Sequence, residues 1–131
     1  MSNVVQEARE FIEKNWTPGF DLAAWRELVV DNNWAALRWP VQWYGRGLSD
    51  DKAEEVEKVF SDARVPGPGQ DKWNLWAGTL VGFGTDELKR QYLRSLLLDE
   101  VAMCLLYSEP GAGSDLAGLR TTAVRDGDEW I

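Results

Sequence analysis

The stretch that decides the fold reads VAMCLLYSEPGAGSDLAGLR and spans residues 101–120. Residues 101–107 are continuously apolar, which is typical of a strand covered on both faces, although periodicity alone leaves a buried helix open. A proline and two glycines then predict a tight, exposed loop over residues 109–115. The sequence therefore predicts that β structure begins here.

The residues upstream of this stretch show helical periodicity interrupted by short loops. The expected buried face of the second helix is Leu22, Trp25, Leu28 and Val29. That of the last helix is Leu88, Tyr92, Leu93 and Leu96. Aromatic residues interleaved with Gly and Pro at 34–48 indicate an ordered loop held by ring packing. About five helices are expected: residues 3–14 with Asn3 as cap, from Asp21 to Asn32, from Ser49 to about Ala63, from Trp73 to Leu80, and after the Thr85 cap.

The residues downstream of the stretch carry a hairpin signal. Asp126-Gly127 is a typical two-residue turn, and residues 129–131 would begin a return strand too short to pair. Asp115 is expected to cap a short turn over residues 116–118. The predicted fold class is therefore mainly α, with an all-helical domain at residues 1–99 and the first strands of an incomplete β domain at residues 100–131.

The composition excludes several classes of function. The chain has 131 residues with 14 basic and 22 acidic side chains, a net charge of −8, which argues against nucleic acid or an anionic membrane as a partner. It has no histidine, so Ser-His-Asp catalysis and the usual zinc sites are excluded. Its one cysteine, Cys104, is expected to be a buried, inert thiol. No secretory signal or apolar run of about 20 residues is visible, so we expect a cytoplasmic protein without a membrane span.

Two further candidate sites, an acidic cluster and Glu109, are set aside. Five acidic residues between positions 50 and 57 suggest a metal site, but lysines interleave with them, and a solvated helix face explains them better. Glu109 has no nearby partner that would tune it as a catalytic base. We therefore expect no metal ligands and no catalytic residue in this chain. The acidic residues are Asp50, Asp51, Glu54, Glu55 and Glu57.

The glycine loop itself leaves two alternatives open. Leu116 stands where a dinucleotide fingerprint needs a third Gly or Ala, and no lysine follows the glycines as in a phosphate loop of the Walker type. The loop is either a plain connection between strands or a cradle of backbone amides for a phosphate or a flavin edge. Ser114 is its best side-chain donor.

At residues 105–115, LLYSEPGAGSD, the chain resembles the first signature of the acyl-CoA dehydrogenase family, and residues 116–131 continue the resemblance. Trp39-Pro40 and residues 45–49 are similar to that family's loop after the second helix, whereas residues 42–44 depart from it. Residues 83–93 are similar to the stretch leading into its fifth helix. The resemblance covers essentially the whole chain.

The resemblance implies a helical N-terminal domain, a middle β-barrel and a C-terminal helical bundle. It also implies FAD as cofactor, an acyl-CoA substrate, α,β-dehydrogenation in fatty acid or lipid catabolism, and an electron-transfer flavoprotein as electron acceptor. The complete protein would be a homo- or hetero-oligomer. The catalytic glutamate and the second flavin segment would lie beyond Ile131, so this chain alone is expected to be inactive.

By position, the resemblance assigns Leu105, Tyr107 and Ser108 to the flavin-contacting segment. It assigns Gly113 and Ser114 to the part that reaches the FAD pyrophosphate, and Ser114 also to the acyl-CoA. Two alternative functions are a non-catalytic helical subunit that completes its β domain with a partner chain, and a free-standing phosphate-binding module.

Overall fold

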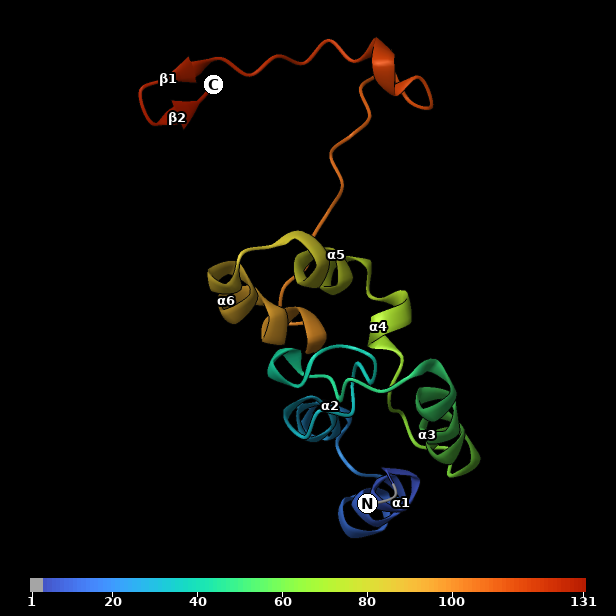
Figure 1. Cartoon of the computed structure of the whole chain (residues 1–131). Coiled ribbons are helices and arrows are strands. Elements are labelled where there is room, and N and C mark those ends of the chain that lie inside the picture. Colours follow the sequence, from blue (N-terminus) through green and yellow to red (C-terminus); the bar gives the residue numbers. More distant parts are fainter. Residues whose placement is uncertain (1–3) are drawn as a thin grey trace.

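The computed structural model describes residues 4–131 and places most of them in a helical body (Figure 1). No helix in this range is long and apolar enough to cross a membrane. Beyond the last helix the chain extends away from the body and ends in a short hairpin. The elements are α1 (Val4–Asn15), α2 (Leu22–Asp31), η1 (Val41–Trp43), α3 (Asp50–Asp62), α4 (Gln70–Trp73), α5 (Leu75–Phe83), α6 (Asp86–Leu97), η2 (Leu116–Gly118), β1 (Arg125–Asp126) and β2 (Glu129–Trp130).

Side-chain caps start the helices where the sequence predicts them. The Asp21 carboxylate accepts a hydrogen bond of 2.8 Å from the Ala24 N–H at the start of α2. The Thr85 hydroxyl oxygen accepts one of 3.3 Å from the Leu88 N–H at the start of α6. Each cap pairs a backbone donor that the first helical turn would leave free. The expected Asn3 cap lies outside the described residues.

The expected helix from Trp73 to Leu80 is in fact two helices. The helix is interrupted at Asn74, whose backbone leaves the helical region with ψ at 87°. The Asn74 side-chain oxygen then accepts a 3.1 Å hydrogen bond from the Ala77 N–H and starts α5. Asn favours such local bonds over a helix interior, so one helix becomes α4 and α5 and the body has six α-helices among the described residues.

The core of the body is aromatic. Trp25, Trp34 and Phe60 are almost completely buried, and they bring α2, the 34–48 loop and α3 together. The Arg46 guanidinium lies 3.3 Å from the centre of the Trp34 ring, which holds the far end of this loop against the core. The expectation of an ordered loop held by ring packing is therefore confirmed.

Arg38 ties the same loop to α3 and α4. Its guanidinium donates to Asp50 at 2.7 Å, to Glu57 at 2.8 Å and to Asp71 at 3.1 Å. Burial raises the pKa of Glu57, but hydrogen bonds from Lys72 and Arg38 outweigh this and hold the pKa below its ordinary value. Two members of the acidic cluster thus serve as partners of Arg38 and are not merely solvated.

The buried faces of α2 and α6 differ in part from the expected ones, although Trp25 and Val29 of α2 are buried as expected. Leu22, Leu88 and Tyr92 were expected inside, yet their exposed fractions are 62%, 42% and 40%. On α6 the expected residues Leu93 and Leu96 are buried, together with Leu97. The helical period places Leu88 and Tyr92 at one edge of the apolar face, and no element among the described residues covers that edge.

The expected strand over residues 101–107 does not form among the described residues. The segment is extended but unpaired and exposed, with Leu106 88% accessible. Cys104 is exposed for the same reason, so the expectation of a buried thiol is wrong. An apolar run becomes a strand only when neighbouring strands satisfy its backbone, and this part of the chain offers none.

The expected hairpin forms, one residue later than predicted. Gly127, at φ +61°, and Asp128 make the turn, and Arg125 pairs with Trp130 in an antiparallel ladder. Mutual backbone bonds of 2.9 Å between Val124 and Ile131 extend it, so the return strand is long enough to pair. The prediction of a mainly α chain is confirmed. The division at residues 99 and 100, and a β-barrel beginning here, stay predictions.

Candidate functional site

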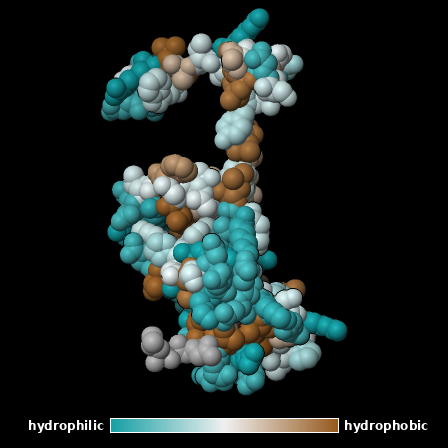
Figure 2. All heavy atoms as spheres, turned by 45° about the vertical axis from the view of Figure 1, so that its right-hand side comes forward, coloured by the Kyte–Doolittle hydropathy of each residue, from teal (hydrophilic) through white to brown (hydrophobic). Residues whose placement is uncertain are grey.

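An apolar groove lies where the extended segment leaves the helical body. Its volume is about 890 Å³, and its walls come from α5, α6 and residues 101–107. Apolar atoms also run along the narrow neck above the body (Figure 2). The exposed residues Phe83, Leu88 and Tyr92 supply part of the helical wall, and Leu105 and Tyr107 supply part of the other.

The glycine loop presents unpaired donors. A turn is closed by the Glu109 N–H donating to the Ala112 carbonyl at 2.9 Å and the Ala112 N–H donating to the Glu109 carbonyl at 3.1 Å. Within the described residues, the N–H groups of Gly113 and Ser114 and the Ser114 hydroxyl have no partner. A side-chain carbon at Gly113 would meet no atom within 4 Å, so the backbone here is open to an approaching ligand.

The carboxylate of Glu109 closes the loop from the other side. It accepts the Arg120 N–H at 3.0 Å and the Thr121 N–H at 2.6 Å, together with the Thr121 hydroxyl. The hydrogen bond from Thr121, with those from the backbone of Arg120 and Thr121, lowers the pKa of Glu109 below its ordinary value. A carboxylate held in its charged form and fully engaged is a poor general base.

The predicted site residues fall into two groups along one continuous stretch. Leu105 and Tyr107 line the apolar groove, whereas Gly113 and Ser114 lie in the glycine loop beyond it. Ser108 sits between the groups, exposed and without a hydrogen-bond partner among the described residues. The stretch therefore has an apolar surface at one end and unpaired hydrogen-bond donors at the other.

Known proteins with similar sequences and structures point to one family for this chain. No protein-family model matches the chain. The acyl-CoA dehydrogenase FadE26 of Mycobacterium tuberculosis is 42% identical over 112 residues, which cover 82% of this chain and 27% of that protein. The resemblance to the acyl-CoA dehydrogenase family is confirmed. The chain spans about a quarter of the length of the curated relatives it matches.

Two solved structures that resemble this chain point in the same direction as the sequence relatives, which are named acyl-CoA dehydrogenases. The ChsE4-ChsE5 complex of Mycobacterium tuberculosis matches with a TM-score of 0.53 at 34% identity, covering 98% of this chain and 35% of that one. The Tcur3481-Tcur3483 steroid ACAD matches with a TM-score of 0.54 at 29% identity, covering 98% and 36%. Both are two-component assemblies by name.

FAD is the cofactor that this family implies, and its pyrophosphate can be compared with the donors in the loop at residues 109–115. FAD carries a pyrophosphate, which backbone N–H groups and hydroxyls bind well. The unpaired donors of Gly113 and Ser114 are of that kind, and the open space at Gly113 lets a ligand approach the backbone. The donor set therefore fits the group.

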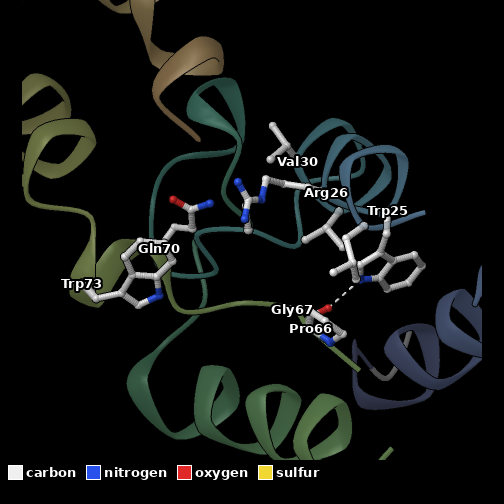
Figure 3. Close-up of a pocket in the computed structure, with 10 residues that line it drawn as sticks. Trp25, Arg26, Val30, Pro66, Gly67, Gln70 and Trp73 are labelled. Carbon is white, nitrogen blue, oxygen red and sulfur yellow. Dashed lines mark hydrogen bonds between the residues drawn. The ribbon is translucent and has the colours of Figure 1, made fainter. Parts of the chain in front are cut away.

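A second pocket was not foreseen from the sequence. It has a volume of about 290 Å³ and lies between α2, α4 and the 66–69 loop, with Trp25 and Trp73 on opposite sides (Figure 3). Two of its polar side chains already have partners: Arg26 pairs with Asp99, and the Gln70 amide donates a 2.7 Å hydrogen bond to the Leu97 carbonyl. No sequence motif could have revealed it, because its walls come from distant segments.

Two features of the main site were also missed. The sequence shows no nearby partner for Glu109, but its partners lie 11 and 12 residues away in the chain. The spacing of Leu88, Tyr92 and Leu96 on α6 signalled an apolar face, but not that the first two would line an open groove. Long-range closure of this kind leaves no local signal in the sequence.

Proposed function

We propose that this chain is the N-terminal part of an FAD-dependent acyl-CoA dehydrogenase that acts on an acyl-CoA thioester in fatty acid or lipid catabolism. The single observation that carries the proposal is the loop at residues 109–115, whose unpaired donors follow directly on an apolar, groove-lining segment. The names of the relatives support the same activity.

In this proposal the two ends of residues 105–114 contact different parts of FAD. Leu105 and Tyr107, which line the groove, and Ser108, which follows them with a free hydroxyl, contact the flavin, as the family resemblance implies. Gly113 and Ser114 donate to the pyrophosphate, and Ser114 also contacts the acyl-CoA. Bound FAD would supply the hydride acceptor for α,β-dehydrogenation.

The proposal assigns no proton transfer to this chain. Of the two acidic residues in the loop, Glu109 is engaged by Arg120 and Thr121, and the Asp115 carboxylate lies beside Gly118. We therefore propose that the base that removes the α-proton comes from residues outside this chain. An electron-transfer flavoprotein would accept the electrons from the complete enzyme, and a cytoplasmic location remains part of this proposal.

Purification of the 131-residue chain tests the proposal that it supplies only part of the flavin and substrate site. We expect protein without stoichiometric flavin, read from its absorbance near 450 nm, and no dye reduction with acyl-CoA substrates. Flavin retained at one per chain, with turnover, would show that the site is complete without further residues and would refute the proposal.

A non-catalytic helical subunit is a second candidate, favoured by the two-component names of the solved neighbours. In that case a partner chain would cover residues 101–107 and supply the rest of the site. The coding sequence after codon 131 separates the candidates. An open frame that continues into further dehydrogenase-like sequence supports the first, and a stop codon followed by a separate dehydrogenase-like gene supports the second.

A further inference from the structure

We propose that Glu109 is a positioning residue: its carboxylate locks the loop over residues 109–121 into the shape that turns the Gly113 and Ser114 donors outward. The inference rests on the proposed function for the use of those donors. The hydrogen bonds from Arg120 and Thr121 to the Glu109 carboxylate, called the lock below, are seen in this chain itself.

The lock joins the two ends of the loop through one side chain. One oxygen of Glu109 accepts the Arg120 N–H at 3.0 Å, and the other accepts the Thr121 N–H at 2.6 Å and the Thr121 hydroxyl. Hydrogen bonds to a carboxylate are stronger than those between neutral groups. One residue thereby closes a loop whose other connections are local.

The backbone of the same residue holds the opposite side of the loop. Its N–H and carbonyl exchange hydrogen bonds with Ala112, at 2.9 and 3.1 Å, and close the turn over Pro110 and Gly111. Ala112 is 4% exposed, so this turn packs inward while the following residues face out. Glu109 is therefore the point where both halves of the loop are fastened.

Close packing inside the loop makes its shape depend on this closure. A side-chain carbon at Gly118 would lie 2.7 Å from an oxygen of Asp115 and 3.8 Å from the Ala112 side chain. A side chain at residue 118 would have to displace the Asp115 carboxylate. The segment 112–118 thus folds back on itself, and Gly113 and Ser114 are left on its outer side with open space around Gly113.

The lock needs an ionised carboxylate in particular. Its partners are all donors, two backbone N–H groups and one hydroxyl, so a glutamine would turn an amide N–H toward at least one of them. Glu129, in the hairpin, is an exposed glutamate whose carboxylate accepts no hydrogen bond among the described residues. It offers a matched control for the loss of one negative charge.

Amide hydrogen exchange on the 131-residue chain tests the lock without any ligand. We expect Glu109→Ala to speed exchange of the Arg120 and Thr121 amides by on the order of five- to tenfold, with Glu109→Gln intermediate and Glu129→Gln unchanged. Equal exchange in the wild-type chain and Glu109→Ala would overturn the inference.

Titration with inorganic pyrophosphate then tests what the lock is for. We expect the Gly113 and Ser114 amide resonances to shift in the wild-type chain, and the apparent affinity to fall several-fold in Glu109→Ala but not in Glu129→Gln. Equal affinity in the wild-type chain and Glu109→Ala would overturn the positioning role. If the wild-type resonances do not shift while exchange still depends on Glu109, the pyrophosphate role of the proposed function fails and the lock stands.

Discussion

Replacing Arg38 with methionine should destabilise the helical body by about 3 kcal/mol. The Asp71 side chain is only 1% exposed, and Arg38 donates to it both from the guanidinium and from its own backbone N–H, each at 3.1 Å. Removing one partner of a buried ion pair costs about 3–5 kcal/mol, and the lower end applies because Arg38 itself is 19% exposed.

The other two partners of Arg38 add little to this loss. Asp50 is 82% exposed, so its pair with Arg38 is screened by water. Glu57 keeps its 2.6 Å hydrogen bond from Lys72. A loss of about 3 kcal/mol is a large part of the roughly 5–15 kcal/mol that stabilises a typical domain, so it is easily measured.

Urea unfolding followed by tryptophan fluorescence measures the effect. The double variant Arg38→Met with Asp71→Asn should recover at least about half of the lost free energy, because no charge is then left buried without a partner. A loss below about 1 kcal/mol in the single variant, or no recovery in the double variant, would refute the reasoning.

The remaining predictions concern two glycines and the loop carboxylate. A side-chain carbon at Gly67 would lie 2.2 Å from the Phe60 ring, so Gly67→Ala should cost about 1–3 kcal/mol in urea unfolding. Gly82→Ala, which meets nothing within 4 Å inside α5, should stabilise by up to about 1 kcal/mol; equal effects would contradict this. Because the folded pKa of Glu109 is lowered, its contribution is complete above its ordinary value of 4.5 and is lost as pH falls through the lowered pKa. The Thr121 amide shift should therefore titrate with a midpoint below 4.5, and a midpoint at or above it would count against the lock.

The helical body could be predicted well because its signals are local. Asp21 and Thr85 are caps that bond donors three residues ahead, and the apolar period of α1 and α3 marks their buried sides. The break at Asn74 was missed, since Trp73, Trp76 and Leu80 keep a helical spacing across it. Only the hydrogen bond of Asn74 to α5 decides the break.

The candidate site could be predicted as a stretch of sequence but not as a shape. The glycines and Ser114 identify the loop, and the apolar run at residues 101–107 marks the segment before it. Whether other strands cover that run could not be predicted, because strand pairing depends on segments elsewhere in the protein. No strand among the described residues covers it, so Cys104 and Leu106 are exposed. The role of Glu109 depends on closure across the loop, which no local pattern encodes.

If the proposed function holds, residues 105–114 form one edge of a flavin and acyl-CoA site. Titration of the isotopically labelled 131-residue chain with FAD, followed by amide resonances, tests it most directly. We predict weak binding, on the order of millimolar, with shifts concentrated at Tyr107, Ser108, Gly113 and Ser114. No shift at these residues, or shifts concentrated at the pocket of Trp25 and Trp73, would contradict the claim.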